Sequence, residues 1–555
     1  MIWPFKKRQA EQSTSNIAAG MLNNILSAMD PYKLGRKDRP REAFQPDGYS
    51  GDRAISDSQD LVSRRVRDLM RNAGQAKRIR SMLTNLVVGK GMQTFAWPFD
   101  PSEMLELITE MESVSGGDLG PRLKYALESD DLYECYSGEK KQFDIEERLT
   151  RYDMERMLMS ECVSVGSGLM LRVFRKDVSP SKHKIPIAWQ MFEREQLDIS
   201  KDRDEGKDRS GRPLNRIMNG IELDSLNRIV AYHLLLNHPH DFFGVNQSSM
   251  VGIPAGAGGK SVRVTADRVV DLTLYDRPSS HVGVSWLAPA GQPIWDRDQY
   301  CESEIRAAAS EAVLLLVAKL ANGSAHGAWG FNDGTDDQDQ HDNREFKLGH
   351  SPVASVIDKD EHIELIKPNR PNRDAGPFLK VLDRDTAASV DLSYHTVSGD
   401  YESVTFTSGR HAKMDEELSI APLQDWFGRS VSLPVRRMFN ASSVTTGLMK
   451  TMRPVAFRDR YATYQRFDVI GNGRSLLDPY KEGEARTARL RTGLSTFREE
   501  CAKRNQHWIR VLMQRSLEKQ IFSMFGVEPD FTKAGNGVVE QSQSQDDQQT
   551  VEDEA

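Results

Sequence analysis

Apolar residues recur at helical spacing near the start of the chain. Between residues 57 and 88, one helix face would carry Leu61, Val62, Val66, Leu69 and Met70. Most arginines of this segment fall off that face, so a solvated surface is the simpler interpretation and a binding patch the alternative. The same periodicity predicts helices over 101–127 and 145–159. Residues 1–56 are polar and interrupted by Gly and Pro, which predicts a mobile arm with a short helix near 17–29.

The pattern changes to short alternating strands between residues 166 and 274. The clearest candidates are the segments 169–174, 187–191, 216–223 and 228–236. The last two are separated by turn-forming residues at 224–227, which predicts a hairpin. Because helices lie on both sides of this β-rich block, we expect an α+β fold class.

The strongest single helix of the sequence covers residues 293–322. Pro293 suits its start, and Asn322 followed by Gly323 gives a stop signal. Its apolar stripe is rich in small side chains and consists of Cys301, Ile305, Ala308, Ala312, Leu315, Leu316 and Leu320. Charged residues of both signs lie off the stripe, which argues against complete burial of this helix inside a single chain. We therefore expect the helix to pack against a second copy of itself through Ile305, Ala308, Ala312 and Leu316.

Residues 323–374 differ in composition from the helices on either side. The segment is rich in Gly and contains five aspartates in a short run, Asp333, Asp336, Asp337, Asp339 and Asp342. Two strands are expected at 353–357 and 362–366, which would give a small α/β unit between two helices. The aspartates form either a docking surface or a solvated insertion, and the sequence leaves both interpretations open.

A helix, a polar loop and a second helix are predicted between residues 375 and 417. The first helix covers 375–397, and the side opposite its apolar positions carries Lys380, Arg384 and Ala387. Turn-forming residues interrupt the pattern from Ser398, and Arg410 opens the next helical run. The loop 398–410 is about a dozen residues long, a length that indicates function more than mere connection.

The C-terminal part of the sequence is again mainly helical. A helix from 410 to 439 should be kinked at Pro422, and residues 466–478 form a Gly-rich turn region. Two long charged helices are predicted over 480–504 and 506–525. From about residue 532 the chain is rich in Gln, Ser and acidic residues, so we expect a disordered acidic tail over 532–555.

Composition and charge narrow the function classes. The chain has 555 residues and a formal net charge of −7, which argues against a protein that grips nucleic acid through clustered Lys and Arg. The cysteines form no CxxC pair, so reduced structural thiols in a cytosolic setting are expected for Cys135, Cys162, Cys301 and Cys501. No apolar run reaches about 18 residues, which predicts no membrane-spanning helix and no membrane partner.

Motifs for chemistry are absent or incomplete. The run GIPAGAGGKS at 252–261 comes close to a phosphate-binding loop, but Pro254 stands where the motif requires glycine, and a strand instead of a helix follows. Neither Ser164 nor Ser167 has both flanking glycines of a GxSxG nucleophile elbow. A metal site is a weak alternative for His233, His238, His240 and Asp241. We therefore expect no catalytic residue, no cofactor and no metal ion.

The loop run SGDYESVTFTSGR at 398–410 is the most specific of six runs that share one order. The others are VVGKGM at 87–92, GIELDSLNRIVAYHLLLNHP at 220–239, RVTADRVVDLTLYDRPSSHVGVSWLAPA at 263–290, IELIKPNRP at 363–371 and GLSTFREECAKRN at 493–505. In this order they resemble the lambda-type portal proteins of tailed bacteriophages, whose loop reads roughly SGDYS and then NYSSAR. The resemblance covers the chain from about residue 57 to about residue 514. The loop departs from the family pattern where Tyr-Ser-Ser-Ala is usual, at Phe406, Thr407, Ser408 and Gly409.

The resemblance implies the parts of a portal subunit. In chain order these would be a mobile arm (1–56), a wing (57–291), a stem helix (292–322), a clip (323–374), a second stem helix (375–397), a channel loop (398–410), a kinked wing helix (411–465), crown helices (466–531) and the tail (532–555). Such a subunit joins a ring of about twelve copies at one capsid vertex. The ring is a conduit for double-stranded DNA and not an enzyme.

The resemblance also implies partners and a location. The expected partners are the terminase large subunit, the major capsid and scaffold proteins, and a neck or head-completion adaptor. The clip would dock the motor and the adaptor, through Asp333, Asp336, Asp337, Asp339 and Asp342. The protein would occur at the portal vertex of the virion and, during assembly, in the host cytoplasm.

The loop is expected to line the narrowest part of the channel. Its lining residues would be Asp400, Tyr401, Glu402, Ser403, Val404, Thr405, Phe406 and Thr407. Asp400 and Glu402 would form a double acidic ring that repels phosphate. The stem would present Lys380, Arg384 and Ala387 to the channel. Two other classes remain open: an ATP-driven packaging motor, which needs an intact phosphate loop, and a capsid-completion protein without a channel.

Overall fold

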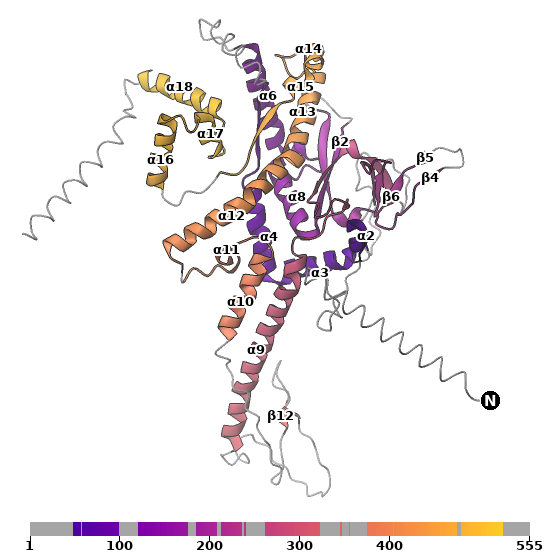
Figure 1. Ribbon diagram of the computed structural model, residues 1–555, viewed down its shortest axis with the longest axis vertical. Coiled ribbons are helices and arrows are strands. Elements are labelled where there is room, and N and C mark those ends of the chain that lie inside the picture. Colours follow the sequence, from indigo (N-terminus) through magenta and orange to yellow (C-terminus); the bar gives the residue numbers. More distant parts are fainter. Residues whose placement is uncertain are drawn as a thin grey trace, which may run out of the picture.

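The computed structural model has a mixed body of helices and strands from which one long helix pair projects (Figure 1). The structure describes residues 48–56, 58–98, 120–175, 185–207, 213–235, 238–239, 261–321, 345–346, 354–355, 375–402, 404–473 and 479–524, with the backbone alone for 310–321, 345–346, 354–355 and 479. Within these ranges every pair of neighbouring strands is antiparallel. Among the helices described, none combines the length and the hydropathy that a membrane span requires.

Three helices open the described part of the chain: α2 (Gly51–Ser56), α3 (Gln59–Asn72) and α4 (Gly74–Val87). The helix predicted over 57–88 is therefore two helices, because Ala73 adopts an extended conformation between them. The predicted arm 1–56 also extends too far. Asp52 of α2 is buried, and it accepts a hydrogen bond from the His281 backbone N–H at 2.5 Å, which docks α2 on the body.

Helices α6 (Pro121–Gly138), α7 (Lys140–Phe143) and α8 (Arg151–Val165) follow. Helix α8 begins at Arg151 and not at residue 145 because Thr150 caps it. The Thr150 hydroxyl accepts from the Asp153 N–H, and the Asp153 carboxylate accepts from the Thr150 N–H at 3.0 Å. Gly166 ends the helix with a φ of 94°, a conformation that favours glycine.

Two antiparallel sheets form the β-rich block. The first has the order β10-β2-β3, made of β10 (Val269–Thr273), β2 (Ser167–Phe174) and β3 (Ile187–Phe192). The second has the order β6-β7-β8-β9, made of β6 (Arg216–Met218), β7 (Ile221–Leu223), β8 (Ile229–Leu234) and β9 (Val262–Thr265). Short connections are η4 (Arg194–Gln196), η5 (Ala266–Arg268) and the pair β4 (Gly206–Lys207) and β5 (Pro213–Leu214).

The hairpin predicted at 224–227 is confirmed, since β7 pairs with β8 across it and Asn227 donates to the Asp224 carbonyl. The single strand predicted over 216–223 is wrong. Asn219 and Gly220 both adopt positive φ, 49° and 78°, so the chain reverses there and forms the β6–β7 hairpin. Asn-Gly is a strong signal for such a turn.

The projecting pair consists of α9 (Ala288–Ala321) and α10 (Ala375–Ala388). Helix α9 begins five residues before Pro293, which lies within the helix near its start. Arg297 Nε donates to Asp383 Oδ1 at 2.7 Å, and the Tyr300 and Phe378 rings meet edge to face at 5.5 Å. These contacts hold α10 beside α9.

The strands β11 (Glu345–Phe346) and β12 (Ala354–Ser355) pair beside the far end of α9 (Figure 1). The strand predicted at 353–357 thus appears as β12, while β11 was not expected from the sequence. The strand predicted at 362–366 and the five aspartates lie outside the described residues.

Helix α11 (Tyr394–Ser398) precedes α12 (Phe406–Phe427), a π-helical segment (Gly428–Ser432) and α13 (Leu433–Thr445). Helix α12 continues past Pro422, although proline has no N–H to donate to the carbonyl one turn earlier, and an irregularity of helix type lies further along the chain. It falls at Gly428–Ser432, directly before Pro434, which lacks the N–H that would bond back into this turn. A Cβ on Gly428 would lie 2.6 Å from the Val469 side chain, so the segment packs tightly on the following strand.

After α14 (Pro454–Asp459) and α15 (Tyr461–Tyr464), the strand β13 (Phe467–Ile470) pairs with β1 (Gln93–Ala96). The predicted turn region 466–478 therefore contains a strand. The C-terminal helices are α16 (Pro479–Arg491), α17 (Phe497–Ala502) and α18 (Trp508–Met524). The helix predicted over 480–504 is broken at Gly493, whose φ is 72°, and Thr496 caps the next helix.

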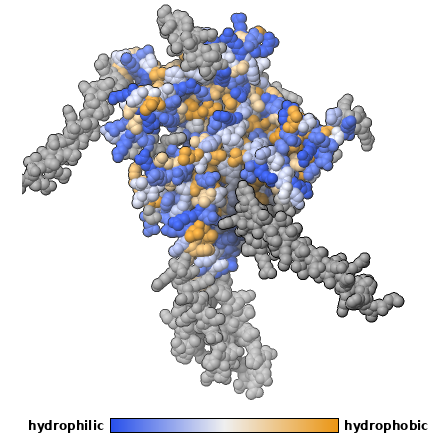
Figure 2. Space-filling model, in the orientation of Figure 1, coloured by the Kyte–Doolittle hydropathy of each residue, from blue (hydrophilic) through white to orange (hydrophobic). Residues whose placement is uncertain are grey.

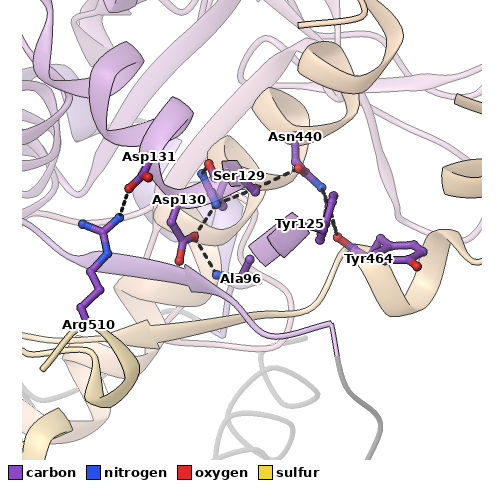
Figure 3. Close-up of polar contacts among 9 residues, drawn as sticks. Ala96, Tyr125, Ser129, Asp130, Asp131, Asn440, Tyr464 and Arg510 are labelled. Carbon is purple, nitrogen blue, oxygen red and sulfur yellow. Dashed lines mark hydrogen bonds and ion pairs between the residues drawn. The ribbon is translucent and has the colours of Figure 1, made fainter. Parts of the chain in front are cut away.

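A buried polar network joins α6, α13 and β1 (Figure 3). Arg436 donates to Asp130 Oδ1 at 2.7 Å, and the Ala96 N–H donates to the same oxygen at 2.9 Å. Asn440 links Ser129 to the Tyr125 hydroxyl. Because the buried Arg436 guanidinium is paired with Asp130, the network fixes how these elements meet without leaving that charge alone in the core.

Candidate functional site

The candidate site is the segment from α10 to α12, the helix–loop–helix singled out in the sequence. The helix predicted over 375–397 ends at Ala388, because the chain turns at Asp391, whose φ is 54°. A separate helix α11 then begins, and the Ser393 hydroxyl caps it by accepting from the Thr396 N–H. Gly399 ends α11 with a φ of 75°. The site therefore contains a short extra helix that periodicity alone did not separate from α10.

The loop that follows is shorter than predicted. Helix α12 begins at Phe406 and not at Arg410, because Thr405 and Ser408 form a capping box. Phe406 and Thr407 accordingly belong to the first turn of α12, while Asp400, Tyr401, Glu402, Val404 and Thr405 precede it. Ser403 lies outside the described residues. The Thr-x-x-Ser spacing is the sequence signal that marks this helix start.

Asp400 is the best-connected residue of the loop. Its carboxylate lies 3.1 Å from Lys380 Nζ and accepts from the Tyr394 hydroxyl at 2.9 Å and from the Glu402 N–H at 3.1 Å. These hydrogen bonds, that of the Glu402 amide first, lower the pKa of Asp400 to about 2. The bond to Asp400 raises the pKa of Lys380, and partial burial with the same bond raises that of Tyr394.

These contacts correct the expected double acidic ring. Asp400 is an acid that Lys380 neutralises, so of the two predicted acidic residues Glu402 alone presents an unpaired carboxylate within the described part of the loop. Tyr401 is 60% exposed and Phe406 is 65% exposed, so the segment also presents two aromatic rings to solvent. Sequence alone did not show this pairing, because Lys380 and Asp400 lie on different elements.

Further contacts attach α11 and the loop to the body. Arg78 Nε of α4 donates to the Thr396 carbonyl at 2.7 Å, and His395 Nδ1 lies 2.8 Å from the Asp400 carbonyl oxygen. The His395 ring stacks on Tyr401 with their centres 6.0 Å apart. Thus the first half of the loop has a defined position.

The expected channel face of α10 combines two exposed cations with a buried alanine. Lys380 and Arg384 are exposed, and the Arg384 guanidinium lies 5.5 Å from the centre of the Tyr394 ring. Ala387 is 1% exposed and belongs to the hydrophobic core with Val390 and Val397. Ala387 lies on the same side of the helix as the two cations, but the last turn of α10 lies against the body and buries it, so it is not available to line a channel.

The proposed inter-subunit stripe of α9 is exposed in the single chain where its side chains are described. Ile305 is 70% exposed and Ala308 is exposed, while the side chains of Ala312 and Leu316 are outside the description. On α10, Phe378 and Val381 are 48% and 59% exposed, and Figure 2 shows an apolar patch over this helix. The helix pair thus presents apolar side chains to solvent.

The weak metal hypothesis is not supported. His240 and Asp241 lie outside the described residues, and His233 Nε2 is 3.7 Å from Glu222. The structure instead brings His238 together with Glu193 and Glu195, whose nearest ligand atoms lie within 4.8 Å of one another.

Glu195, however, already accepts two hydrogen bonds from Arg67, at 2.5 and 2.8 Å. A metal ion here would stand beside a guanidinium, so we interpret this group as an ion-pair cluster. Of the run that comes close to a phosphate-binding loop, residues 252–260 lie outside the description, and Ser261 precedes the strand β9.

Comparison with known proteins assigns the family. The model of the lambda family of phage portal proteins matches residues 37–424, and the chain belongs to this family. The family suggested by the sequence runs is thereby confirmed.

Three curated relatives fit this assignment. The probable portal protein of Halomonas phage phiHAP-1 is 23% identical over 351 residues, which are 60% of this chain and 62% of that protein. Portal protein B of Escherichia phage lambda is 24% identical over 33% of this chain and 34% of its own length. The portal protein of Escherichia phage N15 is 22% identical over 33% and 35%. The matched part thus spans less than two thirds of each relative.

Solved structures give only distant likenesses. A chain in the neck of an empty gene transfer agent particle, computed with C6 symmetry, covers 78% of this chain and 90% of its own length, at 11% identity and a TM-score of 0.33. A chain in the neck of the native particle, computed with C12 symmetry, has 11% identity, the same coverage and a TM-score of 0.28. Scores this low do not establish a common fold.

Proposed function

We propose that the chain forms a ring of about twelve copies at one vertex of a phage capsid, with a central channel for double-stranded DNA. Membership of the lambda portal family, over residues 37–424, is the observation that carries this proposal. The ring would conduct DNA during packaging, retain it afterwards and release it at ejection. Nothing in this role requires a catalytic residue or a cofactor.

The projecting helix pair supports the assembly part of the proposal. Ile305 and Ala308 give α9 an exposed stripe of one large and one small apolar side chain. Ala312 and Leu316 continue the stripe at intervals of four residues in the sequence. Phe378 adds exposed apolar surface on α10. Apolar surface of this kind on a projecting element marks a protein–protein contact.

The loop between α11 and α12 would line the channel. The lining set runs from Asp400 to Thr407, and within it Glu402 would repel phosphate while Tyr401 and Phe406 make apolar contact with the duplex. Contacts of this kind do not read base sequence. A net charge of −7 agrees with a duplex that slides and is not gripped along its whole length.

The remaining parts of the subunit would follow the family plan. We assign the wing to 57–291, the stem to 292–322 and 375–397, the clip to 323–374 and the crown to 466–531. The clip would dock the terminase large subunit and later a neck or head-completion adaptor, through Asp333, Asp336, Asp337, Asp339 and Asp342. Major capsid and scaffold proteins would surround the wing, at the virion vertex and earlier in the host cytoplasm.

Imaging decides between the proposed ring and the alternatives. Negative-stain electron microscopy of the purified protein should give cone-shaped rings with a central hole. A monomer with ATPase activity would indicate a packaging-motor subunit, a class already weakened by Pro254 in the phosphate-loop run. A defined particle without a hole would indicate a capsid-completion protein.

A further inference from the structure

Two exposed cations of α10 face the same part of the loop segment. Lys380 and Arg384 are four residues apart, so they share one face of the helix at about 6 Å along its axis. Lys380 Nζ is 3.1 Å from Asp400, and the Arg384 guanidinium lies over the Tyr394 ring. The Tyr394 hydroxyl donates to the same Asp400 carboxylate. The side chains of Asp400 and Tyr394 therefore cover the face of α10 that carries its two cations.

We propose that Lys380 and Arg384 form a binding site for the phosphate groups of duplex DNA, and that Asp400 masks this site in the conformation described. The proposal rests on the proposed DNA channel and names the residues that would hold the duplex. Lysine binds phosphate as a point charge, and arginine binds it through paired N–H donors. A carboxylate next to the ammonium occupies the same donors and offsets its charge.

The contacts of α11 and of the loop after it explain how Asp400 can move away from Lys380. Thr396 and Val397 of α11 are buried, and Arg78 holds the Thr396 carbonyl, so α11 is fixed on the body. Beyond Gly399 the described loop contains no buried residue. Asp400 is therefore held through surface contacts, with Lys380 and Tyr394 at its carboxylate and His395 at its carbonyl oxygen, which are individually weak. Asp400 can move away from α10 while α10, α11 and α12 stay folded.

Movement of Asp400 would change the charge that each subunit presents to the channel. When Asp400 contacts Lys380, the charge of Lys380 is neutralised, and the duplex meets mainly the carboxylate of Glu402. When Asp400 has moved away, Lys380 and Arg384 of each subunit face the duplex, and the ring repeats this pair around its axis. The first state favours sliding and the second favours retention, with an attraction that weakens as salt is raised.

Assembled rings of single-residue variants test the mask. Asp400→Asn removes the charge that faces Lys380, whereas Asp391→Asn removes an exposed carboxylate from the turn between α10 and α11, outside the proposed lining. Fluorescence anisotropy with a short labelled duplex, across a salt series, measures affinity. Asp400→Asn should bind roughly three- to tenfold more tightly with a steeper salt dependence, and Asp391→Asn should change affinity less than about twofold. Tyr394→Phe, which removes one hydrogen bond to Asp400, should shift affinity in the same direction by less.

The double variant Lys380→Met with Asp400→Asn tests whether tighter DNA binding comes from release of Lys380 or simply from the loss of one negative charge. The affinity gained by Asp400→Asn should disappear in it, because the unmasked residue is gone. A gain that persists in the double variant, or equal effects of Asp400→Asn and Asp391→Asn, would overturn the masking of Lys380 and leave the channel intact as a proposal. Failure of the wild-type chain to form open rings would instead contradict the proposed function. Sedimentation of every variant as a ring is the assembly control.

Discussion

At the scale of single residues, the neighbours Asp130 and Asp131 of α6 have opposite surroundings (Figure 3). Asp130 lies 2.7 Å from Arg436, and neither side chain is more than 3% exposed. Asp131 is 75% exposed and lies 3.0 Å from Arg510. Removal of Asp130 leaves the Arg436 guanidinium without a carboxylate partner in the core. Removal of Asp131 leaves Arg510 at the surface, where water can take the place of the carboxylate.

We predict that Asp130→Ala lowers the free energy of unfolding by about 3–5 kcal/mol, because Arg436 loses its buried partner. Asp131→Ala, which removes the adjacent carboxylate of the same helix, should lower it by less than about 1 kcal/mol and is the matched control. Urea unfolding of the unassembled chain, followed by tryptophan fluorescence, checks both values. Equal midpoints for the two variants would contradict the importance of the buried pair.

At the scale of elements, the C-terminal helices dock on the ribbon formed by β1 and β13. The His507 ring stacks on Phe95 with centres 4.4 Å apart, and the Arg498 guanidinium lies 4.6 Å from the centre of the Trp97 ring. Arg498 also pairs with Asp468 of β13. Neither ring nitrogen of His507 has a hydrogen-bond partner among the described residues. The docking of these helices therefore depends on a neutral imidazole.

We predict that this docking weakens in acid. Burial, reinforced by Arg510 and Arg498, lowers the pKa of His507 to about 4. An undocked His507 would titrate near its ordinary value of about 6.5, so the undocked state binds the extra proton as the pH falls. Docking should be strongest above about pH 6.5 and lose up to about 1.4 kcal/mol per pH unit between there and pH 4.

Hydrogen exchange of α18 at neutral and acidic pH, corrected for the intrinsic pH dependence of exchange, measures this loss. His507→Phe retains a ring on Phe95 but cannot titrate, so its protection should be independent of pH. A wild-type protein whose α18 is equally protected at both pH values would rule out His507 as the cause.

At the scale of the whole molecule, a single chain leaves its projecting helices partly uncovered. Ile305 on α9 and Val381 on α10 are 70% and 59% exposed. Apolar patches of this kind are unusual on a protein that functions as a monomer. The proposed ring would cover them, because each copy would then lie between two others.

We predict that Ala308→Trp abolishes ring assembly and leaves a folded monomer, since a large ring on the stripe of α9 prevents close approach of a second copy. Ser303→Trp places the same ring on the exposed opposite side of α9 and should assemble normally. Sedimentation velocity measures assembly, and circular dichroism measures folding. If the Ala308→Trp variant forms normal rings, the interface between subunits lies on another surface.

For the candidate site, the sequence marked the segment but not the contacts of its residues. The turn chemistry after Ser398 and the family run marked the loop, since these signals are local. The pairing of Asp400 with Lys380 depends on how α11 folds back toward α10, and twenty residues separate the two. Burial of Ala387 depends on the body that the last turn of α10 meets.

By itself, the sequence determined the long helices α9, α12 and α18, the strands β2, β3 and β8, the β7–β8 hairpin and the family. Each follows from spacing or short motifs that act within a few residues. Only the tertiary structure decided that β1 pairs with β13, that Asp52 anchors α2 and that Asp400 faces Lys380. These pairings join residues far apart along the chain, and no local pattern encodes them because each depends on the packing of the elements between.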